Sequence, residues 1–292
     1  MSAAEVAGVE ISKPDKVLFP DDGFSKLDLA TYYDAVADVM LPHLRGRPVN
    51  MQRFPDGVGG MAFYEKKVPS HFPEWMHTVE VHTEDGSQRQ VVADDRRSLV
   101  YLAQQACITP HTWLCTSKSL EKPDQLVFDL DPSDSDLPKV RRATRLVGEL
   151  LDDLGLTTYL KTTGSRGYHV LVPLRPALGF DDVRAFARRC GEVLVDKAPD
   201  LLTLEHRKAK RGDRVYLDIG RNAYGQTAVP AYAVRARPGA PVSTPITWEE
   251  LSRVAPDQHT ITSVRRRLAR RDCPWADVRR HAQGITTARK RL

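Results

Sequence analysis

Acidic side chains on two predicted strands are the residues best suited to chemistry. In the segment LVFDLDP, residues 126–132, side chains alternate between the two faces of a strand, so Asp129 and Asp131 lie on the same face. The segment VYLDI, residues 215–219, alternates in the same way and turns Asp218 outward. Carboxylates on one face repel each other unless cations lie between them. If the two strands are neighbours, three carboxylates converge and could hold two divalent ions for phosphoryl transfer. The alternative is that Asp-x-Asp simply ends a strand.

A glycine-rich turn is the second candidate for chemistry. The segment TTGSRGYH, residues 162–169, places two glycines, four hydroxyls, an arginine and a histidine in a predicted strand–turn–strand. Small residues let backbone N–H groups approach an anion, and Arg166 can donate two hydrogen bonds to phosphate oxygens. No Walker P-loop motif is present. A plain hairpin with glycine at positive φ is the alternative interpretation.

Several isolated residues carry weaker signals, and each has a structural interpretation beside a functional one. His111 lies in a loop-like stretch and is most simply a structural histidine. Arg235 fits a phosphate contact and a surface strand equally well. The others read by default as solvated lysines or core aromatics: Lys16, Lys26, Phe63 and Tyr64.

Composition limits the class of protein. The chain has 292 residues, is 41% hydrophobic and 28% charged, and therefore can bury a substantial core. It has no apolar run long enough for a membrane span and no secretory signal, so we expect no membrane partner. Four dispersed cysteines without a C-x-x-C pair favour a reducing, cytoplasmic location.

The positive charge is concentrated at the C-terminal end. Residues 264–292 contain ten lysines and arginines but only two aspartates, whereas the net charge of the whole chain is +5. Clustered basic residues release counterions from a nucleic acid, so this end could contact a polyanion. A solvated basic helix is the alternative.

Helical and strand patterns are mixed along the chain. A capping box at residues 25–28 begins a helix that Pro42 should end, and further helices are expected over 94–107, 138–154 and 181–198. Strands are expected at 126–131, 158–162, 168–174 and 215–219. The order lacks strict βαβ alternation, which indicates an α/β or α+β class. A turn-rich stretch after Leu114 is the best candidate for a boundary.

Taken together, these segments resemble one family. The order along the chain is DKVLFP (15–20), FYEK (63–66), His111, FDLDP (128–132), TGSRGYH (163–169), Leu-Asp (217–218) and YAVR (232–235). This looks like the polymerase domain of bacterial ATP-dependent DNA ligase D, in the archaeo-eukaryotic primase superfamily. The resemblance extends from about residue 9 to about residue 255 in one register.

The resemblance implies a fold. It is an α+β fold of the archaeo-eukaryotic primase type, in which an RRM-like antiparallel sheet carries the catalytic carboxylates and merges with an N-terminal α/β module. Residues 1–292 would form a single catalytic domain. Its submodules would be 1–114 for binding the DNA end and its 5′-phosphate, 115–255 for catalysis, and 256–292 as a basic C-terminal helix or tail.

The resemblance also implies an activity and roles for residues. Family members are template-dependent nucleotidyltransferases that extend a primer across short gaps and broken ends, prefer ribonucleotides, and use two Mn²⁺ or Mg²⁺ ions. The catalytic metal ligands would be Asp129, Asp131 and Asp218. The residues around the incoming nucleotide would be His111, Thr163, Ser165, Arg166, His169 and Arg235. Those on the DNA would be Lys16 and Lys26 at a 5′-phosphate, Phe63 and Tyr64 stacked on bases, and Arg53 and Lys66 along its path.

Implied partners are gapped or broken DNA with a 5′-phosphate, ribonucleoside triphosphates, a separate ATP-dependent DNA ligase and the end-binding protein Ku, in the cytoplasm at the nucleoid. No K-x-D-G ligase motif occurs, which predicts a stand-alone polymerase or an excised domain.

The sequence departs from the family at four positions. The family usually has Ser, Lys, Trp and Lys in place of Thr163, Arg166, Ile219 and Gln226, respectively. The last departure removes a possible triphosphate contact.

Two other functions compete with a polymerase. A haloacid-dehalogenase-like phosphatase also has a hydrophobic strand followed by Asp-x-Asp, with one Asp as nucleophile. That family places the motif near the N-terminus of a Rossmann-like core, whereas 128 residues precede Asp129 here. A non-catalytic module that binds DNA ends is the third reading, and the complete set of three aspartates speaks against it.

Overall fold

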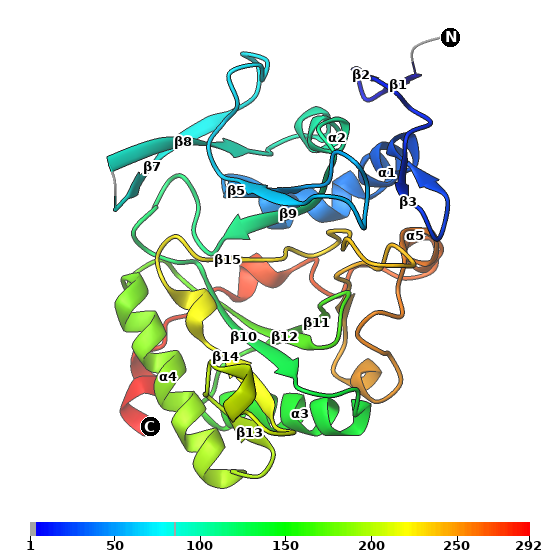
Figure 1. Cartoon of the computed structure of the whole chain (residues 1–292). Helices are drawn as coiled ribbons and strands as arrows, with labels where there is room; N and C mark the ends of the chain where they lie inside the picture. The colour runs from blue at the N-terminus through cyan, green and yellow to red at the C-terminus, as the bar shows by residue number, and fades with distance from the viewer. Residues whose placement is uncertain (1–3, 85) are drawn as a thin grey trace.

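Two six-stranded sheets form the body of the computed structural model, which describes residues 4–84 and 86–292 (Figure 1). The upper strands are β5 (Pro48–Arg53), β6 (Phe63–Glu65), β7 (Thr78–Thr83), β8 (Gly86–Val92), β9 (Cys107–Trp113) and β15 (Thr227–Ala228). The lower strands are β10 (Gln125–Pro132), β11 (Tyr159–Thr162), β12 (Tyr168–Pro173), β13 (Leu202–Thr203), β14 (Val215–Asp218) and β16 (Pro245–Ile246). The upper order is β15-β9-β5-β8-β7, with β6 paired to β5, and the lower order is β13-β14-β10-β12-β11-β16.

Six helices and two small strand pairs complete the described part of the chain. The small pairs are β1 (Ala4–Val6) with β2 (Val9–Ile11), and β3 (Val17–Phe19) with β4 (Phe24–Ser25). The helices are α1 (Lys26–Leu44), α2 (Arg96–Gln104), α3 (Leu137–Asp153), α4 (Phe180–Lys197), α5 (Ile261–Leu268) and α6 (Thr286–Arg291). Among residues 4–84 and 86–292, no helix combines the length and the apolar character that a membrane crossing needs.

The predicted start of α1 is confirmed, and its predicted end is wrong. Ser25 accepts a hydrogen bond from the Asp28 backbone N–H, and the Asp28 carboxylate accepts one from Ser25, which completes the capping box. The helix continues through Pro42 to Leu44. Because Pro42 lies in the last turn, it removes a single backbone hydrogen bond, and burial of Leu41 and Leu44 holds the turn in place.

The other predicted helices are present, with shifted ends. Helix α2 is shorter than expected because Ala106 adopts a positive φ of 55°, which ends helical geometry just beyond Gln104. Helix α3 begins at Leu137, where the side chain of Asp136 caps the first turn and Pro138 occupies an early position that needs no N–H partner.

The lower sheet is organised around β10, which is antiparallel to both of its neighbours, β12 and β14. A mixed α+β class is confirmed, and strict βαβ alternation is absent. The antiparallel neighbours also exclude the phosphatase alternative, because a Rossmann-like core would place parallel strands beside the Asp-x-Asp strand.

Strand β10 separates two hydrophobic cores. Its residues Leu126, Phe128 and Leu130 are fully buried in a core formed with α3 and α4, as the alternation of side chains predicts. Val127 points the other way and joins the core of the upper sheet. Toward its C-terminal end the same face carries Asp129 and Asp131, which therefore look toward the upper sheet rather than into either core.

Buried tyrosines of α1 tie the upper half of the molecule to the segment around residue 234. The hydroxyl of Tyr32 donates to the carbonyl of Tyr232 at 2.9 Å. The hydroxyl of Tyr33 donates to the carbonyl of Ile108 at 2.6 Å and accepts from the backbone N–H of Val234 at 3.2 Å. These bonds fix the position of the residue that follows Val234, which is Arg235.

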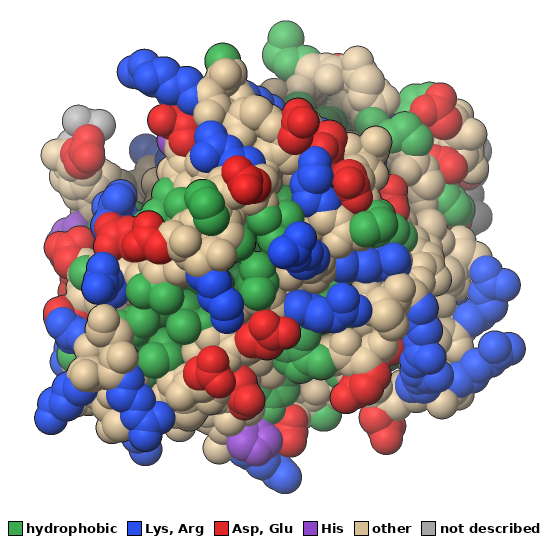
Figure 2. Space-filling model, turned by 90° about the horizontal axis from the view of Figure 1, so that it is seen from below, with side chains coloured by type: hydrophobic (Ala, Val, Ile, Leu, Met, Phe, Trp, Pro, Cys, Tyr) green, Lys and Arg blue, Asp and Glu red, His purple; other side chains and the backbone are tan. Residues whose placement is uncertain are grey.

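The basic C-terminal segment returns to the body of the protein. Helix α5 packs on α1, the indole of Trp275 is buried and donates to the carbonyl of Leu160 at 3.0 Å, and Ala288 of α6 joins the α3–α4 core. Figure 2, seen from below, shows basic side chains interspersed with acidic and hydrophobic ones on that face. The lower surface of the molecule therefore carries mixed charges rather than one uninterrupted basic patch.

Glu250, in the short helix η3 (Glu249–Ser252), is buried and forms an ion pair with Arg267 of α5 and another with the more exposed Arg271, which follows α5. Arg267 approaches its carboxylate with both terminal nitrogens, at 2.5 and 2.8 Å, and Arg271 adds a contact at 3.0 Å. The hydrogen bonds from Arg267 outweigh burial and lower the pKa of Glu250 from 4.5 to about 2. This stabilisation is complete above pH 4.5 and is lost as the pH falls toward 2.

We expect the Glu250→Gln variant to lose roughly 3 kcal/mol of unfolding free energy at neutral pH and to lose less additional stability between pH 5 and pH 2 than the wild type. Urea unfolding across this pH range measures the effect. Glu192→Gln is the matched control, because Glu192 makes an exposed pair with Arg189 at 3.6 Å and should shift stability by less than about 1 kcal/mol. Parallel pH profiles for the wild type and Glu250→Gln would contradict the assignment.

Candidate active site

A cavity of about 400 Å³ opens between the two sheets. All nine residues expected to bind metal or nucleotide line this one cavity: His111, Asp129, Asp131, Thr163, Ser165, Arg166, His169, Asp218 and Arg235. Tyr64 of β6 also reaches it. The upper sheet therefore supplies one wall, and the carboxylate face of the lower sheet supplies the other.

The carboxylates come from directly paired strands. In the antiparallel register of β10 and β14, Asp129 lies opposite Asp218, and Asp131 lies opposite Tyr216. The side chains of Asp129 and Asp218 are 16% and 17% exposed, and that of Asp131 is 37% exposed. The predicted convergence is thus present on adjacent strands, with two carboxylates deep in the cavity and the third toward its mouth.

Arginines neutralise the repulsion that the sequence predicts among these carboxylates. Arg221 lies between the deep pair, with its Nε 3.5 Å from Asp129 and 3.2 Å from Asp218. Asp131 is contacted by Arg166 at 3.5 Å and by Arg211 at 3.4 Å. Each carboxylate is therefore held by a cationic side chain, and the acidic face carries no uncompensated charge.

His169 contacts the deepest carboxylate. Its Nε2 lies 3.2 Å from Asp129 Oδ1. Burial alone would raise the pKa of Asp129, but the contact with His169 and the charge of Arg221 hold it well below its usual range. Burial, with help from the charge of Lys161, lowers the pKa of His169 to about 4. At neutral pH the pair is therefore an aspartate beside a neutral imidazole.

The glycine-rich turn joins β11 to β12 and is held by its own side chains. The Thr163 hydroxyl donates to the carbonyl of Gly167 at 2.9 Å and accepts from the N–H groups of Ser165 and Gly167, each at 3.2 Å. The N–H of Gly164 donates to the carbonyl of Pro256. Protein oxygens thus already accept from the N–H groups of Gly164, Ser165 and Gly167, so these three amides do not face an anion in this structure.

With these amides occupied, side chains rather than backbone groups are available in this turn to contact a ligand. Arg235 donates to the carbonyl of Thr163 at 2.7 Å and thereby fixes the turn to the segment held by α1. Gly164 has a φ of +64°, and a Cβ there would lie 2.7 Å from Cγ of Arg235, so the close approach requires glycine. The guanidinium groups of Arg166 and Arg235 give this wall of the cavity its positive charge.

His111 lies on β9 rather than in a loop, opposite Asn50 of β5. Its ring packs edge-on against Tyr64, with 5.4 Å between the ring centroids. Burial and the nearby charge of Arg235 lower its pKa to about 3, so the ring is neutral. Within the described residues its Nε2 is buried without a hydrogen-bond partner, and a ligand in the cavity could supply the missing partner.

The side chains expected on the DNA lie outside the cavity, with the exception of Tyr64. Phe63 and Tyr64 are 40% and 57% exposed, so their interpretation as core aromatics is wrong. Arg53 forms an ion pair with Glu65 and lies 5.4 Å from the ring centre of Phe63. Lys66, which follows β6, is exposed.

The two lysines expected at a 5′-phosphate, Lys16 and Lys26, lie close together at the start of α1. Lys26 is 7% exposed, and its ammonium group donates to the carbonyl of Ser12 at 2.6 Å. Burial first, and then the charges of Lys16 and Lys13, lower its pKa. Lys16 forms an ion pair with Asp56 at 3.3 Å, whereas the ammonium group of Lys26 forms no ion pair among the residues that the structure describes.

The sequence reasoning missed three cationic residues. Arg221 and Arg211 hold the carboxylates, and Lys161 is buried beside His169, where burial lowers its pKa to about 7 despite the opposing charge of Asp129. Arg221 lies three residues after Asp218, and this short spacing could have indicated an ion pair between the two side chains. Arg211 is hidden in a basic run. Gln226 is exposed and does not line the cavity.

The donor set suits a divalent cation. Within residues 4–84 and 86–292, no three acidic, histidine or cysteine side chains are already arranged around a common point as a closed metal site. Asp129, Asp131 and Asp218 nevertheless offer hard oxygen donors from adjacent strands, and these are the ligands that Mg²⁺ and Mn²⁺ prefer. The three carboxylates line one cavity and are paired with arginine side chains, so this donor set fits such an ion.

Comparisons with known proteins agree with this geometry. A family profile described as "LigD, primase-polymerase domain" matches residues 25–275. "Multifunctional non-homologous end joining protein LigD" of Pseudomonas aeruginosa is 37% identical over 295 residues, covering 99% of this chain and 35% of that protein. "Bifunctional non-homologous end joining protein LigD" of Bacillus subtilis is 31% identical over 279 residues, covering 94% of this chain and 45% of that protein. The chain thus spans less than half the length of these relatives, 35% and 45% respectively.

A solved structure is similar over nearly the whole chain. The "Polymerase Domain from Mycobacterium tuberculosis Ligase D in complex with DNA" aligns with a TM-score of 0.87 and 31% sequence identity, covering 94% of this chain and 99% of that one. The family and the primase-like α+β fold expected from the sequence motifs are both confirmed.

Proposed function

Because the chain belongs to the family of LigD primase-polymerase domains, which are nucleotidyltransferases, we propose that it fills short gaps and extends broken ends during DNA repair by non-homologous end joining. The observation that carries this proposal is the single cavity in which Asp129 faces Asp218 beside the cationic turn at Arg166. A non-catalytic binding module would have no need for three carboxylates held in this way.

A divalent metal would be held by Asp129, Asp131 and Asp218, and we propose two ions, Mn²⁺ or Mg²⁺. Bound there, they would supply positive charge to the attacking and leaving oxygens of phosphoryl transfer. Arg221 separates the two deep carboxylates and is the side chain that must shift when their oxygens are engaged. His169 contacts Asp129 at 3.2 Å and would help to orient it, and Arg221 supplies the positive charge beside it.

The incoming nucleotide would be a ribonucleoside triphosphate. Arg166 and Arg235 suit the phosphates, because a guanidinium group can donate two parallel hydrogen bonds to phosphate oxygens. Ser165 and His169 line the same wall, and Thr163 shapes the turn. The unpartnered Nε2 of His111 and the nearby Tyr64 would meet the sugar and base.

The DNA would enter past the exposed side chains of β6. Phe63 and Tyr64 offer flat faces for stacking on template or end bases, with Arg53 and Lys66 along the phosphate path. A separate ATP-dependent DNA ligase and the end-binding protein Ku are the proposed protein partners. The proposed location is cytoplasmic, at the nucleoid.

Primer extension on a labelled gapped duplex tests the proposed function. In the presence of Mn²⁺ we expect templated addition of nucleotides, with ATP incorporated at lower concentration than dATP. A site that bonds to a 2′-hydroxyl leaves polar groups unpaired when the hydroxyl is absent, at a cost of about 1–3 kcal/mol. Binding of DNA without extension would indicate a non-catalytic module. Equal efficiency of incorporation of ATP and dATP would contradict only the proposed contact with the 2′-hydroxyl and not the polymerase function.

Recognition of a 5′-phosphate by Lys16 and Lys26 is a separate expectation. The mutual repulsion of these lysines would be relieved by a doubly charged terminal phosphate at the N-terminus of α1. Gapped DNA with a 5′-phosphate should bind more tightly than DNA with a 5′-hydroxyl in a fluorescence anisotropy titration at moderate salt.

The Lys16→Ala and Lys26→Ala double variant should bind both gapped DNAs equally while still extending a simple primer-template. Lys118→Ala with Lys122→Ala provides a control that removes two positive charges elsewhere. Equal binding of the two DNAs by the wild type would show that these lysines are ordinary surface charges.

A further inference from the structure

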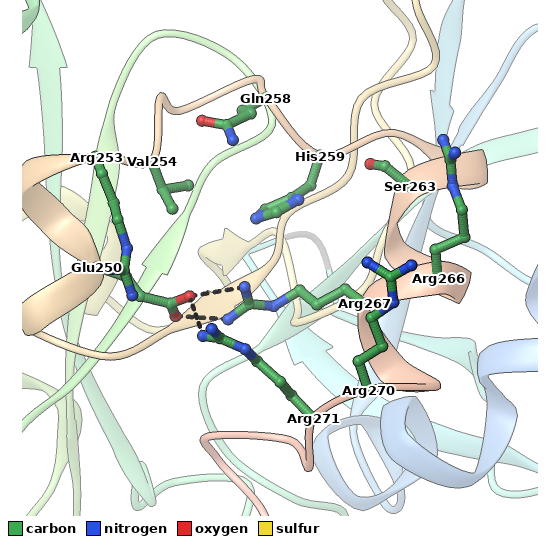
Figure 3. Close-up of a pocket in the computed structure, with 10 residues that line it drawn as sticks. All are labelled: Glu250, Arg253, Val254, Gln258, His259, Ser263, Arg266, Arg267, Arg270 and Arg271. Atoms are coloured by element: carbon green, nitrogen blue, oxygen red, sulfur yellow. Dashed lines mark hydrogen bonds and ion pairs between the residues drawn. The ribbon is translucent and has the colours of Figure 1, made fainter.

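A second basic cavity lies on the far side of the glycine-rich turn from the carboxylates. It has a volume of about 500 Å³, and η3, the loop after it and α5 line it (Figure 3). The loop joins it to the active-site turn, since the carbonyl of Pro256 accepts from Gly164 and the carbonyl of Val254 accepts from the hydroxyl of Tyr168. The two cavities therefore share one scaffold.

The charge in this cavity is only partly compensated. Figure 3 shows the carboxylate of Glu250 bonded to Arg267 and Arg271. Three further arginines also line the cavity, namely Arg253, Arg266 and Arg270, and all three are exposed. Among residues 4–84 and 86–292, their guanidinium groups make no hydrogen bond or ion pair. One buried carboxylate thus fixes two arginines in place and leaves three cationic groups free to bind an anion.

A buried imidazole gives an independent indication of a ligand. His259 is 9% exposed, and Figure 3 shows its ring projecting into the space beside Arg267. Its Nε2 is buried and lacks a hydrogen-bond partner within the described residues. A buried polar nitrogen without a partner costs free energy, and a phosphate oxygen at this position would accept its hydrogen.

The position of the cavity indicates which anion it binds. Arg266 also lines an adjoining pocket with Phe24 and Asp28, at the start of α1. The basic surface of α5 therefore continues to the element at which we place the 5′-phosphate. A duplex that begins at that phosphate would bring its backbone across α5.

We propose that Arg253, Arg266, Arg270 and His259 bind backbone phosphates of the duplex downstream of the gap. This inference rests on the proposed function, because it extends the DNA-binding surface of the same enzyme. An acidic protein segment is the competing occupant, and the arginines alone would accept either. The continuity with the start of α1 favours DNA.

The test uses the full chain and gapped DNAs whose downstream duplex grows from half a helical turn to two turns. We expect the affinity of the wild type to rise with duplex length. The triple variant Arg253→Gln, Arg266→Gln, Arg270→Gln should lose this rise, at least about tenfold near physiological salt. The slope of log affinity against log salt should fall by about two to three. Extension of a primer-template without downstream duplex should be unchanged.

Two further variants isolate the cause. Arg188→Gln, Arg189→Gln and Lys197→Gln remove the same charge from the exposed face of α4, which Figure 1 shows at the opposite side of the molecule, and should retain the dependence on length. His259→Phe should lower affinity several-fold without changing the salt slope, and thermal unfolding verifies that it folds.

The outcomes separate the two proposals. If the wild type extends primers but the first triple variant keeps its dependence on duplex length and its salt slope, the downstream-duplex site is overturned and an acidic protein becomes the occupant to seek. If the wild type neither binds nor extends DNA, the proposed function itself fails, and this inference fails with it.

Discussion

Asp129→Asn is expected to reduce nucleotide addition by more than about a thousandfold, because it removes one of the three oxygen donors that we propose for the cations of phosphoryl transfer. Asp131→Asn should behave similarly. DNA binding should persist in both variants, because the aromatic and basic side chains proposed to contact DNA lie elsewhere. Single-turnover primer extension beside an anisotropy titration measures the two effects separately.

Asp134→Asn is the control for this pair of variants. Asp134 follows the same strand but lies outside the cavity, where it forms an ion pair with Lys139, at 2.5 Å. It should extend primers at the wild-type rate. A primer-extension rate of Asp129→Asn within a few-fold of the wild-type rate would contradict the assignment of the carboxylates as metal ligands. A loss of folded protein, visible in circular dichroism, would instead point to the pair with His169.

Gly167→Ala is expected to disrupt the catalytic sheet itself. A Cβ at this position would lie 1.7 Å from the backbone oxygen of Leu130, a distance that no side-chain rotation can relieve. Strands β10 and β12 would have to separate beside Asp129 and Asp131. We expect a loss of about 4 kcal/mol or more of unfolding free energy, together with loss of activity.

Gly284→Ala is the matched control, since its added Cβ would meet only the end of the Arg175 side chain, at 3.6 Å, and its backbone is not in the left-handed region. It should change stability by less than about 0.5 kcal/mol. Urea unfolding of both variants checks the difference. Wild-type stability for Gly167→Ala would show that β10 and β12 are packed less closely than the structure has them.

The sequence predicts the catalytic face because that face depends on a short-range rule. Alternation along residues 126–132 and 215–219 decides which carboxylates share a side, and the register of β10 with β14 then places Asp129 opposite Asp218. The capping box of α1 is likewise local, so its start is predicted correctly. The end of the same helix is predicted wrongly because Pro42 suggests a stop, whereas burial of Leu41 and Leu44, a tertiary effect, keeps the last turn helical.

What the sequence does not predict depends on contacts between distant segments. Arg211 compensates Asp131 across 80 residues, and nothing near Arg211 in the chain marks it as different from its basic neighbours. The sequence of the turn at residues 163–167 is typical of an anion-binding loop, yet the N–H groups of Ser165 and Gly167 donate to the hydroxyl of Thr163 instead. The exposed position of Phe63 and Tyr64 depends on where β6 forms, since it pairs with β5 off the main path of the upper sheet.

The hydrogen bonds of Tyr32 and Tyr33 to residues 232–234 have a consequence for the order of folding. They span 200 and 201 positions of the chain, so the loop between them must close before Arg235 can reach the turn. The nucleotide site that we propose should thus be among the last parts of the molecule to form during refolding, after both sheets. In hydrogen exchange, the amide of Val234 should report this late closure, and bound nucleotide should slow its exchange.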